Sequence, residues 1–424
     1  MMPRSKLESI LAKLGMVFDG ELGTYVHKST NIPLSILYDE KTRRVKAIDQ
    51  TKLPYELSIW ETDDWREILT AIRSMVIRGA PLIGCAGAFA LLLAAKDLES
   101  KKPNDLLGGL RKASRMVVYG RPTGVDAENI AGRIVKAAES VYLQGLGSHD
   151  IVDKVEEEVQ SFFVENLLLN KALRDQGARF FHEEDVVLTH CEAGSLATSY
   201  GGSALGIIAE VAVANPSIMV VVKETRPRCQ GYKLATWELS RAGIPVVSVT
   251  DNMVSSSIER YHVTKAIVGA DRITRDGCVT NKIGTHDLAL ICSSYHVPFY
   301  VAAPCSTLDL KRERGEIPIE ERDPSEVSNF YRYEALYMKS RGLLSPDALD
   351  RWPTSIAEGK ELPSRGEIGI FNPAFDVTPP DLVSKVILDI GAYDPRKLGE
   401  LGEDDVRARA KKTVGRYLRL FGEG

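Results

Sequence analysis

Short β-branched runs alternate with helix-like segments through the second half of the chain, and this alternation constrains the fold more than any other feature. The runs are Val186–Thr189, Met219–Val222, Val246–Thr250, Lys265–Val268 and Pro298–Ala302. Helical patterns fill the intervals near residues 195–213, 229–242, 254–260 and 283–295. Nearly continuous apolar strands separated by helices are typical of a parallel sheet in an open α/β domain. We therefore predict such a domain from about residue 184 onward.

Polar or reactive residues follow four of these predicted strands: Cys191, Glu224, Asp251 and Asp271. Open parallel sheets bind their ligands at the carboxyl ends of the strands, so these side chains are candidates for one shared site. Each residue alone also fits a turn or a helix cap, and for Asp251 that interpretation has equal weight.

The first half of the chain has a different pattern. The 424 residues exceed one ordinary core, so we predict two domains, a mainly helical one over residues 1–175 and the open-sheet one over 176–424. Small β elements are expected early in the first domain, at Val45–Leu53 and Leu57–Glu61. Helical spacing then predicts helices over 65–78, 82–95, 104–119, 126–144 and 150–176, of which the second is apolar all round and must be buried.

Composition excludes several classes of function. Lys and Arg number 54 against 58 Asp and Glu, a net charge of −4, which argues against a general nucleic-acid partner. The longest apolar stretch, Pro81–Ala95, is too short to span a bilayer, and the first residues lack the apolar core of a signal peptide. Six cysteines without a C-x-x-C pair predict a reduced, cytoplasmic protein with neither a disulfide framework nor a structural zinc site.

Two further absences bear on cofactors. The seven histidines form no H-x-x-x-H pair, which disfavours a hydrolytic metal site. Neither a phosphate loop of the G-x-x-x-x-G-K-[ST] type nor a G-x-G-x-x-G fingerprint follows a strand. We therefore expect no metal, no nicotinamide and no other cofactor.

The segment from Thr189 to Ser195, with Cys191 at its centre, is the strongest local motif. A cysteine between a strand and a helix faces the positive end of the helix dipole, which would lower the pKa of its thiol and favour the thiolate. The following Gly194 and Ser195 can bring backbone N–H groups close to an anion. The alternative is a buried cysteine that acts as a small apolar residue.

Further candidates are cations, amides and one carboxylate. Gln230 follows two arginines, Arg226 and Arg228, in a loop that could read an anion or a sugar hydroxyl, or could simply be solvated. Asp271, followed by Asn281 and Lys282 at a predicted helix start, suits a phosphorylated polyol, with proton transfer at the carboxylate and phosphate at the lysine. Arg78, at the end of a predicted helix, and Arg121, before a proline, are candidates to reach across from the first domain.

Taken together, these motifs resemble the methylthioribose-1-phosphate isomerase family. The resemblance rests on Met75–Pro81, Gly120–Thr123, Thr189–Cys191, Glu224–Pro227, Gln230–Gly231, Gly269–Ile273, Asn281–Thr285, Ile317–Asp323 and Asn372–Pro380, all in order. The broader group also holds ribose-1,5-bisphosphate isomerases and regulatory subunits of the initiation-factor 2B guanine-exchange complex.

The resemblance implies an α/β fold, with a helical N-terminal domain carrying small β elements and a Rossmann-like, open parallel-sheet C-terminal domain, usually as a homodimer. It implies Cys191 and Asp271 as the catalytic pair. The residues implied to hold phosphate or sugar are Arg78, Gly79, Ala80, Arg121, Gln230, Asn281 and Lys282. The implied activity is the conversion of 5-methylthioribose 1-phosphate to its ketose in methionine salvage.

The chain departs from the family pattern at several places. Glu192 follows the cysteine where the family usually has asparagine, and Gly124 and Val125 follow the Arg121 motif where an apolar residue and asparagine are usual. An insertion lies near residues 328–366, within a stretch over 322–370 that we expect to be loop-like. A basic amphipathic helix is expected as a C-terminal extension, from Asp404 to Phe421. The alternatives are therefore the same isomerisation on 5-deoxyribose 1-phosphate or ribose 1,5-bisphosphate, or a non-catalytic regulatory subunit.

Overall fold

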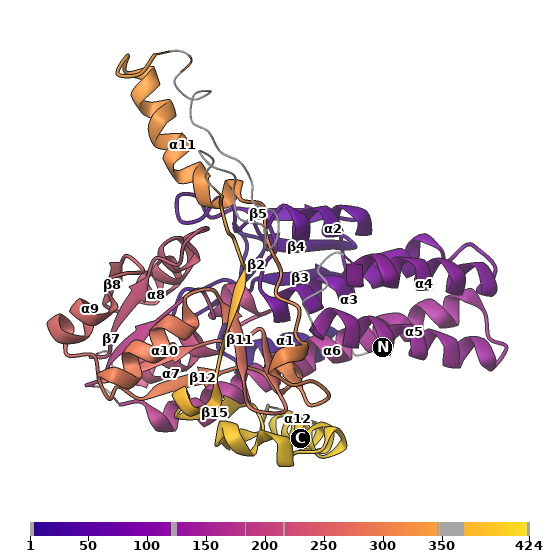
Figure 1. Cartoon of the computed structure of the whole chain (residues 1–424). Coiled ribbons are helices and arrows are strands. Elements are labelled where there is room, and N and C mark those ends of the chain that lie inside the picture. Colours follow the sequence, from indigo (N-terminus) through magenta and orange to yellow (C-terminus); the bar gives the residue numbers. More distant parts are fainter. Residues whose placement is uncertain are drawn as a thin grey trace.

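The computed structural model describes residues 4–119, 125–182, 184–214, 217–345, 347 and 369–421 of the chain. Figure 1 shows a helical N-terminal half packed against a C-terminal half that is built around one large sheet. The predicted fold class is confirmed: a helical N-terminal region with small β elements joins a mostly parallel C-terminal sheet.

The N-terminal half begins with a short helix and two small antiparallel sheets. These elements are α1 (Arg4–Lys13), the hairpin β1 (Met16–Asp19) and β2 (Thr24–His27), and the sheet of β3 (Ile36–Asp39), β4 (Arg44–Ile48) and β5 (Ile59–Thr62). The predicted strand over residues 45–53 is shorter than expected, because the chain turns after Ile48 and leads to a cis Leu53–Pro54 bond.

Five helices follow: α2 (Trp65–Arg73), α3 (Ala80–Asp97), α4 (Pro103–Tyr119), α5 (Val125–Leu143) and α6 (Ser148–Gly177). Asp64 caps α2 as its sequence predicts, with its side chain accepting the Arg66 N–H at 2.8 Å. The helix ends at Arg73, so the expectation that Arg78 closes it is wrong, and Arg78 lies instead on the turn that leads to α3.

Helix α3 is the centre of the N-terminal core. Its residues from Pro81 to Ala95 are all buried, as the uninterrupted apolar sequence predicts. Among the described residues it is the one helix whose length and composition would fit a membrane span, and 83% of that stretch is buried inside the molecule. Helices α2, α4, α5 and α6 pack around it (Figure 1).

The C-terminal half is organised by a seven-stranded sheet in the order β16-β15-β12-β9-β6-β7-β8. Its strands are β6 (Val186–Thr189), β7 (Met219–Lys223), β8 (Val246–Val249), β9 (Lys265–Val268), β12 (Phe299–Ala302), β15 (Lys385–Leu388) and β16 (Gly391–Tyr393). All neighbours pair in parallel except β15 and β16. All five strands predicted from the sequence are present.

The helices between these strands are α7 (Ala204–Ala214), α8 (Thr236–Arg241), α9 (Val254–Tyr261) and α10 (Thr285–Ser294). The prediction of one helix over 195–213 is partly wrong. A single 3₁₀ turn covers Ser195–Ala197, and the chain then runs irregularly, through Gly201 and Gly202 in the left-handed region, to the start of α7.

A second, separate sheet of four strands was not predicted. Its order is β13-β10-β11-β14, with β13 at Leu308–Asp309, β10 at Arg272–Thr274, β11 at Val279–Lys282 and β14 at Phe375–Thr378. Asn281 and Lys282 therefore end a strand rather than begin a helix, since α10 starts three residues later.

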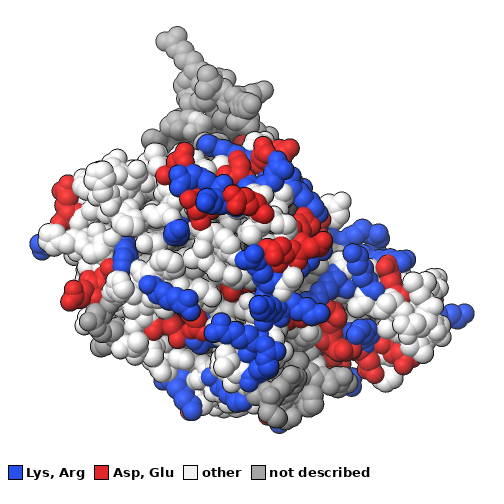
Figure 2. Space-filling model, turned by 90° about the horizontal axis from the view of Figure 1, so that it is seen from below, with Lys and Arg blue, Asp and Glu red and all other residues white. Residues whose placement is uncertain are grey.

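Two helices complete the chain. Residues Ser325–Ser340 form α11, which corrects the expectation of a loop over this part of the insertion; the helix projects from the body, and none of its residues is buried (Figure 1). The predicted C-terminal helix is present as α12 (Glu403–Phe421), which packs against α6. Over the face drawn in Figure 2, acidic and basic side chains are interspersed, so neither sign of charge dominates that face.

Candidate functional site

A cavity lies where the N-terminal half meets the carboxyl edge of the large sheet. Its volume is about 170 Å³, and it is partly open to solvent. Its walls come from the turn before α3, from the loops after β6, β7 and β9, and from the end of β11. Parallel sheets bind ligands at this edge, so the cavity is the candidate active site.

The first wall is the turn from Met75 to Pro81, which leads into α3. Gly79 has a left-handed φ of 100°, and a Cβ atom there would lie 2.5 Å from the Cα of Ala197. Glycine is therefore required for the close approach of this turn to the loop after β6. Gly79, Ala80 and Pro81 line the cavity at the amino end of an 18-residue helix, where unpaired N–H groups and the helix dipole favour an anion.

The second wall carries Cys191. Its φ of 66° places a non-glycine residue in the left-handed region, and its N–H donates to Thr225 Oγ1 at 2.8 Å. Such strained conformations persist where surrounding contacts hold them, and they gather at functional sites. Burial raises the pKa of the Cys191 thiol, although the Arg78 and Lys282 cations act to lower it. The expected fall in this pKa is therefore wrong, because the next α-helix begins only at Ala204 and the thiol is buried.

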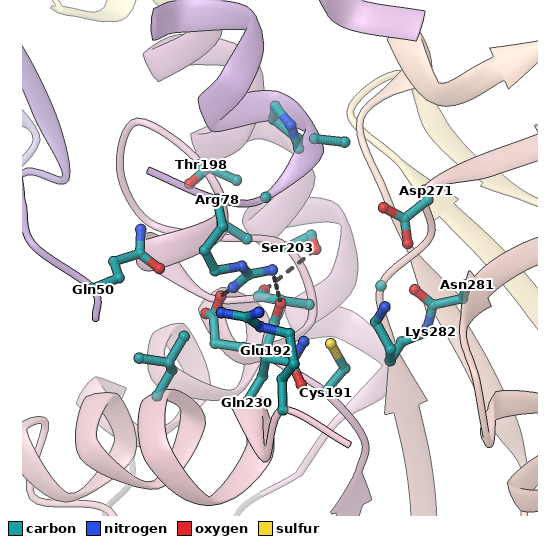
Figure 3. A pocket seen from close by; sticks show the side chains of 18 of the residues that line it. Gln50, Arg78, Cys191, Glu192, Thr198, Ser203, Gln230, Asp271, Asn281 and Lys282 are labelled. Carbon is teal, nitrogen blue, oxygen red and sulfur yellow. Dashed lines mark hydrogen bonds and ion pairs between the residues drawn. The ribbon is translucent and has the colours of Figure 1, made fainter. Parts of the chain in front are cut away.

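Glu192 and Arg78 form a buried ion pair beside the cysteine (Figure 3). The Glu192 side chain has no exposed surface; one carboxylate oxygen accepts an Arg78 Nη1–H and the other accepts the Gly194 N–H at 2.6 Å. Burial alone would lower the pKa of Arg78, but the charge and hydrogen bond of Glu192, together with the nearby Cys191 and Asp271, outweigh it, and the pKa is raised. Arg78 therefore stays charged at the wall of the cavity.

A second buried carboxylate, Glu238, holds the loop that follows. Its oxygens accept the backbone N–H groups of Ser195 at 2.6 Å and Leu196 at 3.2 Å. Burial, and then the nearby Glu192 carboxylate, raise the pKa of Glu238 to about 8. Close to neutral pH, Glu238 is thus largely protonated.

The third wall carries Asp271, Asn281 and Lys282, on the opposite side from Arg78 in Figure 3. The Asp271 N–H donates to Thr280 O at 3.0 Å, which ties the loop after β9 to β11. Lys282 is buried; its Nζ donates to Ala374 O at 2.7 Å and lies 4.5 Å from the centre of the Phe375 ring. Asn281 Nδ2 donates to Thr285 Oγ1 at 3.0 Å.

Of the residues named from the sequence, Arg78, Gly79, Ala80, Cys191, Gln230, Asp271, Asn281 and Lys282 all line this one cavity. Arg121 lies outside the described residues. The loop after β7 is not merely solvated, because Arg228 pairs with Glu326 of α11 at 2.8 Å and Arg226 Nη2 donates to Val327 O at 2.7 Å.

Several lining residues were missed, among them Gln50, Thr198, Ser203, Lys233 and Arg322. Arg322 falls in the Ile317–Asp323 motif, and Lys233 lies in the helical segment Gly231–Ala235. The others sit in turns or loops with no motif of their own, and only the folded chain brings them to the cavity. Gln50 shows this well: its Nε2 donates to Leu196 O at 2.8 Å, and its Oε1 is buried without a hydrogen-bond partner among the described residues. No three His, Cys, Asp or Glu side chains in the described ranges are grouped as a metal ion would require.

Comparison with known proteins gives consistent matches over most of the chain. Residues 76–395 match the model of the initiation factor 2 subunit family. The 5-deoxyribose 1-phosphate isomerase of Moorella thermoacetica is 40% identical over 353 residues, which are 83% of this chain and 92% of that protein. The methylthioribose-1-phosphate isomerase of Chloroflexus aurantiacus is 38% identical over 358 residues, 84% of this chain and 94% of that one. The crystal structure of 5-methylthioribose 1-phosphate isomerase from Pyrococcus horikoshii superposes with a TM-score of 0.71 at 30% identity, covering 91% of this chain and 96% of that chain.

Proposed function

Since the chain belongs to the initiation factor 2 subunit family, and within it to the methylthioribose-1-phosphate isomerases, we propose that it converts 5-methylthioribose 1-phosphate to 5-methylthioribulose 1-phosphate. The observation that carries the proposal is the placement of Cys191 and Asp271 on different walls of one cavity, beside the amino end of α3. A sugar between the two walls would meet both groups at once.

The phosphate would be held by the turn before α3. Backbone N–H groups at a helix start and an adjacent guanidinium form a site that suits a phosphate ester. Gly79 and Ala80 supply the helix start, and Arg78 supplies the cation. Lys282 adds positive charge from the opposite wall.

The chemistry begins with ring opening, because the phosphate on C1 blocks the free aldehyde that other aldose isomerases use. Asp271 gives a proton to the ring oxygen as the bond from C1 to that oxygen breaks. The hydrogen on C2 then moves to C1, and the proton of the 2-hydroxyl goes back to Asp271 as the C2 carbonyl forms. Asp271 thus ends in the state in which it began, and the sugar is a ketose.

The hydrogen can move by either of two routes. In the first, Cys191 takes it from C2 as a proton and returns it to C1 through an enol. In the second, it moves directly as a hydride in a cavity from which water is excluded, and the thiol forms part of the dry wall. The raised pKa of the buried thiol favours the second route, because a protonated thiol is a poor base.

The identity of the 5-substituent is the finer part of the proposal. Apolar side chains line part of the cavity and suit a methylthio or a methyl group: Met75, Pro81, Ala197, Leu234, Pro304 and Phe375. The second candidate substrate is 5-deoxyribose 1-phosphate, because the Moorella relative, which is 40% identical to this chain, is named for it. Ribose 1,5-bisphosphate would bring a second phosphate next to these apolar groups.

We propose a cytoplasmic homodimer that acts in methionine salvage without metal or other cofactor. The six cysteines are free in the structure, which suits a reduced compartment. The homodimer and the pathway are carried over from the family resemblance.

The test is a substrate panel with the purified protein. Formation of ketose from 5-methylthioribose 1-phosphate, 5-deoxyribose 1-phosphate and ribose 1,5-bisphosphate is followed by NMR in D₂O. Preferred turnover of the methylthio sugar is expected, and retention of the C2 hydrogen at C1 would indicate the hydride route. Absence of turnover with all three sugars would replace the proposal by the regulatory-subunit alternative.

A further inference from the structure

Glu192 is a fully buried carboxylate in the wall of a cavity that we expect to bind an anion. Its two oxygens accept hydrogen bonds from Arg78 and from the Gly194 N–H. A neutral amide could accept only one of these two bonds, because its NH₂ group is a donor. The carboxylate therefore fits both donors, and it also places a negative charge in the cavity wall, where burial of a charge is costly.

Cations outnumber carboxylates around the cavity. The cations that line it are Arg78, Arg228, Lys233, Lys282 and Arg322, and the carboxylates are Glu192 and Asp271. Two of these cations are already paired behind the wall, Arg228 with Glu326 at 2.8 Å and Arg322 with Glu320 at 3.1 Å. Arg78 is paired with Glu192 itself, so the positive charge available to a ligand is smaller than the number of cations suggests, and Glu192 is one cause of this reduction.

The position of Glu192 makes its charge effective. It directly follows Cys191, and its partner Arg78 precedes the helix start that would hold the phosphate. Inside a cavity with little water, a charge acts on others over several ångströms without direct contact. The energy of this repulsion grows with the charge of the ligand.

We propose that Glu192 is a specificity-determining residue, whose fixed negative charge beside Arg78 admits sugars with one phosphate and rejects sugars with two. The inference rests on the proposed function and narrows its substrate to ribose 1-phosphates with an uncharged 5-substituent. The competing explanation is that Glu192 only holds Arg78 in place. An amide could still hold Arg78 but would not repel a second phosphate, so Glu192→Gln separates the two.

The experiment measures binding by calorimetry in a Cys191→Ala background, so that bound sugar is not turned over. The probes are 5-deoxyribose 1-phosphate and ribose 1,5-bisphosphate. With Glu192 in place, the monophosphate should bind more tightly. Glu192→Gln should raise the affinity for the monophosphate by about threefold or more and the affinity for the bisphosphate by about tenfold or more. The reason is that the repulsion it removes scales with the charge of the ligand. Glu165→Gln is the matched control, since Glu165 pairs with Arg133 at 2.6 Å outside the cavity, and neither affinity should change.

Equal changes for the two sugars, no change, or weaker binding of both would overturn the proposal. If Glu192→Gln does not fold, the Cys191→Ala protein with Glu192 in place still tests the proposal. In that protein, bisphosphate binding as tight as monophosphate binding would contradict a charge that rejects the bisphosphate. Failure of both probes to bind would overturn it as well. Turnover is measured separately on the unaltered protein, so a protein that discriminates in binding but isomerises no sugar would refute the proposed function and leave this inference standing.

Discussion

Removal of the Arg78 side chain should destabilise the protein through the carboxylate that it leaves behind. The Arg78 side chain is 14% exposed and that of Glu192 0%, so Arg78→Ala leaves a buried carboxylate without its cation. Among the described residues, it then keeps the hydrogen bond from the Gly194 N–H. Breaking a buried ion pair by deleting one partner costs about 3–5 kcal/mol. We expect Arg78→Ala to lower the free energy of unfolding by an amount in that range.

The double variant Arg78→Ala with Glu192→Gln tests the cause of this loss. Without the charge on residue 192, the penalty of an unpaired carboxylate disappears, and we expect more than half of the lost stability to return. A coupling of about 2 kcal/mol or more between the two sites is the expected result of the double-mutant cycle. Binding of the phosphate should not return, because the guanidinium is absent in both variants.

The assay is urea unfolding and steady-state kinetics on the same preparations. KM for the sugar phosphate should rise about tenfold or more in both Arg78 variants, since a charge-assisted hydrogen bond contributes about 1.5–3 kcal/mol. Arg111→Ala is the control, because its side chain is 50% exposed and that of its partner Glu139 is 34% exposed, and it should cost about 1 kcal/mol or less. The reasoning is refuted if Arg78→Ala is as stable as the unaltered protein. It is also refuted if adding Glu192→Gln to Arg78→Ala restores none of the lost free energy of unfolding.

Four further outcomes are expected. Cys191→Ala and Asp271→Asn should each lower kcat by about a hundredfold or more while the protein stays folded. The kcat of the double variant should be little lower than that of the poorer single variant. Near-normal turnover in either single variant removes that residue from the mechanism. Lys282→Ala and Arg121→Ala should each raise KM by about tenfold, and unchanged KM values would contradict a phosphate-binding role. The pKa of Glu238 is raised from 4.5 to about 8, so between these values the folded chain keeps a proton that the unfolded chain has lost. The free energy of unfolding should therefore fall as pH rises across that interval, by up to about 1.4 kcal/mol per pH unit. Glu238→Gln should flatten this fall in urea titrations between pH 5 and 9. Exhaustive chelation should leave activity intact, and restoration of a lost activity by a divalent metal would show that expectation to be wrong.

The parts of the fold that could be predicted are those determined by residues close together in the sequence. The strands β6, β7, β8, β9 and β12 are apolar runs bounded by polar residues, and a run of this kind has few alternatives to a buried parallel strand. The position of Cys191 and Asp271 at one edge follows from the same pattern, since parallel strands end on the same side. The resemblance to a family added residues that no pattern marks, namely Gly79 and Ala80.

The parts that could not be predicted depend on contacts between distant segments. Arg78 and Glu192 are 114 residues apart, so nothing in either sequence neighbourhood indicates their ion pair. The thiol pKa of Cys191 was expected to fall because a helix was expected to start directly after it, but the folded loop delays that helix to Ala204 and buries the sulfur. The strands of the second sheet are short, and β14 pairs with β11 only after the chain has passed through the insertion.

The loop that follows Cys191 shows why the site needs both halves of the chain. Although this loop leaves a strand of the C-terminal sheet, its backbone carbonyls are bound by the N-terminal half: Ser195 O accepts from Ser35 Oγ at 2.8 Å, and Ser199 O from the Ser35 N–H at 3.0 Å. Glu238 binds the N–H groups of the same loop from the C-terminal side. The cysteine is thus held in its strained conformation by contacts from both halves, and the helix start that would bind the phosphate belongs to the half that lacks the cysteine. The proposed catalytic and phosphate-binding groups therefore come together only where the two halves meet, and neither half contains the complete set.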